Sequence, residues 1–118
     1  MFYSSSLTSF ISDLDSLKTG YHMFAFCADL TTLEVDNLPV LSNGQGMFEG
    51  CYGVTEWDVE LPSLTNGQSM FCGCYNLTTF NADLSSLTDG ECMFTECYNL
   101  TAFNCDDLSN LTTGWEMF

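Results

Sequence analysis

The chain has 118 residues, 16 acidic side chains, a single lysine (Lys18) and no arginine, so its formal net charge is −15. One lysine cannot form the basic face that nucleic-acid phosphates require, which excludes a nucleic-acid partner. Hydrophobic residues make up 46% of the chain, too many for a disordered acidic segment. No apolar run approaches the roughly 18 residues that span a bilayer. We therefore expect one folded domain with an acidic surface and no membrane insertion.

An internal repeat organises the whole chain. The pair Met-Phe recurs at positions 1, 23, 47, 70, 93 and 117, and similar sequence follows it each time. The pairs divide the chain into repeats 1–22, 23–46, 47–69, 70–92 and 93–116, and Met117-Phe118 opens a sixth. A repeat of this length cannot close a core alone, but stacked repeats bury a continuous one. We expect the chain to be a piece of a longer protein, the alternative being copies that stack end to end into a filament.

Each repeat begins with the motif Met-Phe-x-x-Cys, at 1–5 (with serine in place of cysteine), 23–27, 47–51, 70–74 and 93–97. We expect a short helical or 3₁₀ segment there. The spacing Leu-x-x-Phe-x-Ala follows at 7–12, 30–35, 54–59, 77–82 and 100–105, with substitutions of similar character. Its alternation predicts a short strand that pairs in parallel with the equivalent strand of the next repeat.

Two leucines and a glycine complete each repeat. The glycines are Gly20, Gly44, Gly67, Gly90 and Gly114, each preceded by Thr, Asn or Asp. Asn-Gly and Asp-Gly favour a tight turn in which glycine takes a positive φ. The apolar positions align into six columns, which we expect to form the core. The predicted fold is a leucine-rich-repeat-like solenoid, with one parallel strand per repeat and the helical segment on the opposite side.

The columns match the pattern Leu-x-x-Leu-x-Leu, and the order Gly, aromatic, Cys in 77–97 resembles BspA-like leucine-rich repeats of bacterial surface proteins. The Met-Phe pair resembles a short-repeat variant found in proteins of gut bacteria and their phages. Where that family usually has Ile-Pro after the strand, this chain has Asp-Leu. The resemblance implies surface recognition and fixes no ligand.

The cysteines and the single histidine do not form a recognisable chemical site. Cys27, Cys51, Cys74 and Cys97 recur once per repeat, which favours small apolar core residues over disulfides or a zinc site. Cys72, Cys92 and Cys105 lie off that column. His22 has no recurring partner, so we expect a surface histidine. No nucleophile, base and orienting group converge, and we expect no enzymatic activity.

The outward positions of the strands are the candidate binding site, because carboxylates gather there. The candidate residues are Glu34, Asp36, Glu56, Asp58, Glu60, Asn81, Asp83, Asn104 and Asp106. Stacking places like charges one strand apart, where they repel, so a cation, salt or basic partner should offset them. The alternative is a solvated acidic face that maintains solubility. A flat strand face rarely supplies the six to eight oxygens that calcium prefers, so we expect no cofactor and at most weak calcium binding.

The sequence thus favours a recognition or adhesion module, on a cell surface or a phage virion appendage, that binds a host or matrix protein or a glycan. The alternative is a structural spacer or fibre that extends by stacking its repeats. Self-association through open ends would accompany the second reading.

Overall fold

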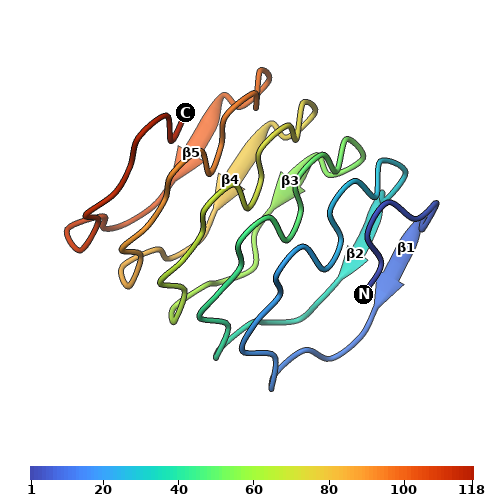
Figure 1. Cartoon of the computed structure of the whole chain (residues 1–118), viewed down its shortest axis with the longest axis horizontal. Coiled ribbons are helices and arrows are strands. Elements are labelled where there is room, and N and C mark those ends of the chain that lie inside the picture. Colours follow the sequence, from blue (N-terminus) through green and yellow to red (C-terminus); the bar gives the residue numbers. More distant parts are fainter.

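The computed structural model describes residues 1–118 and contains five short parallel strands and no helix (Figure 1). The strands are β1 (Ser9–Ile11), β2 (Thr32–Glu34), β3 (Glu56–Trp57), β4 (Thr79–Asn81) and β5 (Ala102–Asn104). Each falls within a predicted strand segment. The repeats follow one another along the molecule, and the two termini lie at its opposite ends (Figure 1).

A second row of parallel contacts joins the repeats away from the strands, a few residues before the next Met-Phe motif. Single bridges pair Thr19 with Asn43, Asn43 with Asn66, Asn66 with Asp89, and Asp89 with Thr113. Each bridging residue directly precedes a glycine of the column. The repeats are therefore hydrogen-bonded to one another at more than the strands.

The predicted helical segment is wrong, because Met-Phe-x-x-Cys forms consecutive turns. In the second repeat the amides of Met23, Ala25 and Cys27 donate within the segment, to carbonyls three residues earlier. The amides between them, at 22, 24 and 26, donate instead to carbonyls of the next repeat at 2.6–3.0 Å. His22 and Phe26 both have positive φ, at 46° and 59°. A backbone that re-enters the left-handed region this often cannot continue a right-handed helix.

The glycine column is confirmed as a structural feature, but the predicted positive φ is wrong. Positive φ among glycines is found at Gly46, Gly50 and Gly73, none of which belongs to the column. A Cβ atom on Gly44 would lie 2.8 Å from Met70 Sδ, and one on Gly67 would lie 2.9 Å from the equivalent methionine. The column therefore needs glycine because the methionine that comes after the next glycine of the column packs against its backbone.

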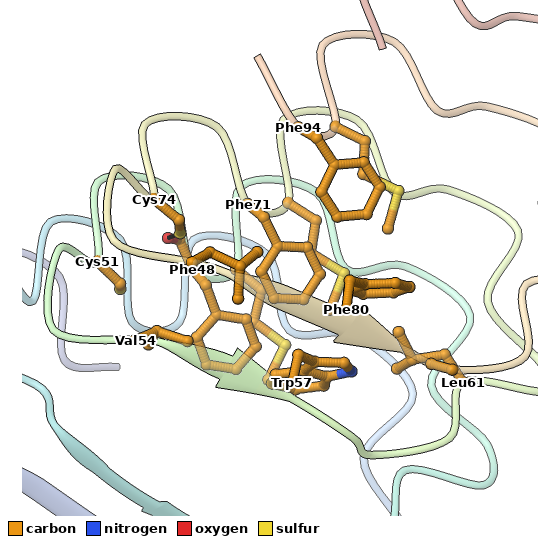
Figure 2. Close-up of a cluster of buried hydrophobic side chains, with 14 of the residues drawn as sticks. Phe48, Cys51, Val54, Trp57, Leu61, Phe71, Cys74, Phe80 and Phe94 are labelled. Atoms are coloured by element: carbon orange, nitrogen blue, oxygen red, sulfur yellow. Dashed lines mark hydrogen bonds between the residues drawn. The ribbon is translucent and has the colours of Figure 1, made fainter. Parts of the chain in front are cut away.

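The core follows the predicted columns. Phe2, Phe24, Phe48, Phe71, Phe94 and Phe118 form one continuous stack, with neighbouring ring centroids 5.4–5.6 Å apart. Trp57 and Phe80 pack against this stack from the strand side (Figure 2). The core-column side chains of the three inner repeats are mostly buried, whereas those of the first and last repeats are mostly partly exposed. Apolar burial along the rod axis is what stabilises such a stack.

The predicted strand ladder is interrupted once, between β2 and β3. β1 pairs with β2, and β3, β4 and β5 form a separate three-stranded sheet. The second repeat has Leu33 in the column where the others have an aromatic ring, so less side-chain volume lies between these strands. The third repeat has Gly53 where the fourth has Asn76, whose amide donates to the carbonyl of Tyr52 at 2.8 Å. The junction between repeats two and three therefore lacks both the paired aromatic rings and the asparagine bond that are found at the two junctions after it.

Candidate functional site

The predicted binding residues lie along the outward side of the strands. Glu34, Glu56, Asn81 and Asn104 lie on β2 to β5 and are exposed. Register places Asn81 directly beside Asn104. Asp36, Asp58, Glu60 and Asp106 follow the strands and are also exposed. The structure thus brings most of the candidate residues to one face of the molecule.

Two of the candidates already serve the fold. The carboxylate of Glu60 accepts the backbone amide of Asp83 in the next repeat at 2.6 Å. The Asp83 carboxylate accepts the amide of Ser85 at 2.7 Å, which closes a turn after β4, and Asp83 is partly buried. Glu60 and Asp83 therefore have less freedom to bind a partner than Glu34, Glu56 and Asp58, for which no side-chain hydrogen bond is found.

No basic side chain of the chain neutralises this face. The one contact at ion-pair distance joins His22 Nδ1 to the Glu49 carboxylate at 3.4 Å, and it involves no residue of the strand face. His22 was expected at the surface, but it is partly buried beside Tyr3 and Tyr21. No group of three or more His, Cys, Asp or Glu side chains is placed to hold a metal ion.

The interruption of the ladder opens a hollow of about 240 Å³ within the acidic face. We name it the β2–β3 slot; its walls include Thr31, Leu33, Val54, Thr55, Glu56 and Asp58. Trp57 and Val59 also line it. Leu33 is partly exposed, unlike its fully enclosed counterpart Phe80. The slot therefore combines apolar walls with two exposed carboxylates.

The indole of Trp57 leans away from β2. Its ring centroid lies 5.1 Å from that of Phe48 and 5.0 Å from that of Phe71, and its Nε1 donates to the carbonyl of Val59 at 2.8 Å. These contacts are with its own repeat and the following one, and not with β2. As a result, the indole does not fill the space left by Leu33.

The cysteine column is buried and structural. Cys27, Cys51 and Cys74 are buried, Cys97 is partly buried, and all seven cysteines are free thiols. The thiol of Cys51 donates to the carbonyl of Phe24 at 3.0 Å, and the same contact recurs in the other repeats. Burial raises the pKa of Cys51 to about 12. Such thiols stay protonated near neutral pH, so they are poor nucleophiles and poor metal ligands.

A row of stacked tyrosines was not predicted from the sequence. Tyr52 and Tyr75 stack with centroids 4.8 Å apart, and Tyr75 and Tyr98 with centroids 5.4 Å apart. The Tyr75 hydroxyl donates to the Glu96 carboxylate at 3.3 Å, and this negative charge is the main cause that raises the pKa of Tyr75. The dipeptide Cys-Tyr recurs in the last three full repeats, and that recurrence is the signal that could have revealed the row.

One short parallel strand per repeat, inside columns of leucine and phenylalanine, is the arrangement of a leucine-rich-repeat protein. A family model described as the BspA type leucine rich repeat region matches residues 1–115 in six copies. The chain belongs to this family, whose members are generally associated with surfaces and adhesion. No curated protein and no solved structure matches the chain.

The structure has no helix with the length and apolar character needed to cross a bilayer.

Proposed function

We propose that the chain is a non-enzymatic recognition module, a solenoid on a cell or virion surface that binds a basic protein partner through its outward strand face. The observation that carries this proposal is an acidic face with no counter-charge of its own. Exposed carboxylates of neighbouring repeats repel one another, and a cationic partner would relieve that repulsion while steering itself to the face. A glycan is the other partner class that the sequence suggests.

A binding face and a solvating surface differ in one testable respect. Binding should depend on where the negative charges lie, whereas solvation depends only on how many there are. A strand-face variant carries Glu34→Gln, Asp36→Asn, Glu56→Gln and Asp58→Asn, and leaves Glu60 intact because it supports the next repeat. A control variant removes the same charge elsewhere through Asp29→Asn, Glu49→Gln, Glu96→Gln and Glu116→Gln.

Binding of both variants to oligolysine and to an array of basic proteins and glycans would test the proposal. We expect the strand-face variant to lose binding and the control to retain most of it. Binding should also weaken as salt is raised, because the charges are exposed. Equal losses in the two variants would show that net charge alone is responsible, which would leave the face as a solvating surface.

A weak calcium response is compatible with this proposal, whereas tight binding is not. Calcium prefers six to eight oxygen ligands, and the strand face presents its carboxylates in a nearly flat row. We therefore propose that no metal or cofactor is required, and that isothermal titration with calcium would give at most weak heats.

The alternative, a spacer or fibre, is favoured by the apolar character of the two end repeats. Phe118 and Trp115 are 67% and 65% exposed, and Ile11 at the other end is 67% exposed. A hollow of about 330 Å³, with Phe94, Tyr98, Leu100 and Phe118 in its walls, lies in the last repeat. Light scattering of the 118-residue chain tests the fibre: particles that lengthen with concentration would support it, and a stable monomer would rule out end-to-end stacking.

A further inference from the structure

One backbone carbonyl at the β2–β3 slot has no hydrogen-bond donor, whereas the equivalent carbonyls at the other junctions each accept a hydrogen bond from the next repeat. The carbonyls of Thr8, Thr55 and Thr78 each accept the amide of the matching threonine in the next repeat, at 2.8–3.0 Å. At the interrupted junction the carbonyl of Thr31 accepts no hydrogen bond from Thr55 or any other residue. Thr31 and Thr55 both line the slot. A ligand in the slot would therefore meet a free carbonyl oxygen.

The remaining walls combine an apolar channel with negative charge. Leu33, Val54 and Trp57 supply the apolar surface, and Val54 and Trp57 lie along the β3 segment under the phenylalanine stack (Figure 2). Glu56 and Asp58 supply two carboxylates. The volume of about 240 Å³ lies below the roughly 300–1,000 Å³ usual for small-molecule sites. A single long side chain suits this space better than a cofactor.

We propose that the β2–β3 slot binds one arginine side chain of the basic protein partner. An arginine has an apolar stem that packs along leucine and valine, and a planar head with five N–H donors. That head can donate to the Thr31 carbonyl and to a carboxylate at once. Lysine offers a compact and more strongly hydrated charge that matches this wall less well. The inference rests on the proposed function, since it names the contact that the acidic face makes.

The fluorescence of Trp57 can report binding in the slot once the other tryptophan, Trp115, is replaced. In a Trp115→Phe background, titration with oligoarginine and oligolysine of equal length would report on the slot through tryptophan emission. We expect oligoarginine to bind at least about fivefold more tightly and to change the emission more. The exposed position of Trp115, at 65%, makes its replacement safe for the core.

Two variants separate the slot from the acidic face as a whole. Leu33→Phe restores an aromatic ring to its column and should fill the slot, so the preference for oligoarginine should disappear while oligolysine still binds. Asp58→Asn should reduce the same preference without adding volume. If Leu33→Phe does not fold, the result for Asp58→Asn alone tests the slot. Asp29→Asn removes one charge outside the slot and should keep the preference.

Each outcome bears on a different claim. A preference for oligoarginine that survives both Leu33→Phe and Asp58→Asn would overturn the slot. Equal binding of the two peptides to the Trp115→Phe protein would also overturn it, while the proposed function would stand. If neither peptide binds, both the slot and the proposed function fail. Loss of the preference in Asp29→Asn as well would assign it to net charge and reject the slot.

Discussion

Gly44 should tolerate alanine poorly because of a neighbouring side chain rather than its own backbone conformation. An alanine Cβ would lie 2.8 Å from Met70 Sδ and 3.2 Å from Leu64 Cδ1, against about 3.5–4.0 Å for ordinary carbon contacts. Met70 and Leu64 are fully buried, so neither can move without displacing other core atoms. Overpacking of this kind costs about 1–3 kcal/mol. The lower flexibility of the unfolded alanine chain offsets about 0.4–1 kcal/mol, which leaves a net loss of about 1–2 kcal/mol.

A double-mutant cycle, measured by urea unfolding at constant pH, isolates that contact. Met70→Ala alone should cost about 2–5 kcal/mol because it leaves a cavity. In the double variant the new methyl group of residue 44 enters the emptied space, so the combined loss should be smaller than the sum by about 1–2 kcal/mol.

Gly114→Ala is the matched control, since its residue lies in the last repeat and is exposed, with Leu111 alone within 4 Å of the added atom. We expect its loss to be under about 0.5 kcal/mol. An equal cost of Gly44→Ala with and without Met70 would refute the contact explanation and point to a backbone requirement.

Three other predictions follow from single contacts. Because burial raises the pKa of Cys51 to about 12 and that of Cys97 to about 12, the folded state holds these protons to higher pH than the unfolded state does. These two thiols should therefore leave the free energy of unfolding unchanged below about pH 9 and lower it as the pH rises from there toward 12. Cys51 should contribute a decline of up to about 1.4 kcal/mol per pH unit. Urea unfolding at several pH values should show a shallower decline for Cys51→Ala. Glu96→Gln should lower the pKa of Tyr75, whose phenolate absorbance would appear at lower pH; an unchanged titration would mean that the carboxylate is not the cause. Asn76→Ala should lower the free energy of unfolding by about 1 kcal/mol, because its amide bonds to the preceding repeat, and a neutral result in thermal and urea unfolding would show that this bond adds nothing.

The columns of the sequence predicted the core, because each core position is repeated and chance variation averages out. The phenylalanine stack, the leucine positions and the buried cysteines all lie where the alignment of repeats places them. The strands were also located correctly, since alternation of buried and exposed residues is a local property. Parallel pairing was predicted correctly for three of the four junctions between neighbouring strands.

The errors share one cause, which is that a motif read alone does not show the contacts it makes with the neighbouring repeats. Met-Phe-x-x-Cys suggests a helix if its amides bond locally, yet every second amide of 22–27 bonds to the next repeat. Asn-Gly suggests a positive φ if the turn is considered alone, yet Gly44 is fixed by Met70 from another repeat. Both outcomes depend on stacking and cannot be read from one repeat.

The candidate site differs from the core in being defined by departures from the repeat. Leu33 and Gly53 stand where the later repeats have an aromatic ring and an asparagine, and the asparagines bond to the preceding repeat at the last two junctions. Neither substitution adds a charged or reactive group, so a search for catalytic residues passes over them. They lie where β2 and β3 are unpaired beside Glu56 and Asp58, and a recess interrupts the acidic face there. In a chain built from near-identical repeats, a position where the pattern fails is the one place that differs from its equivalents, and this is why the proposed arginine contact is placed there.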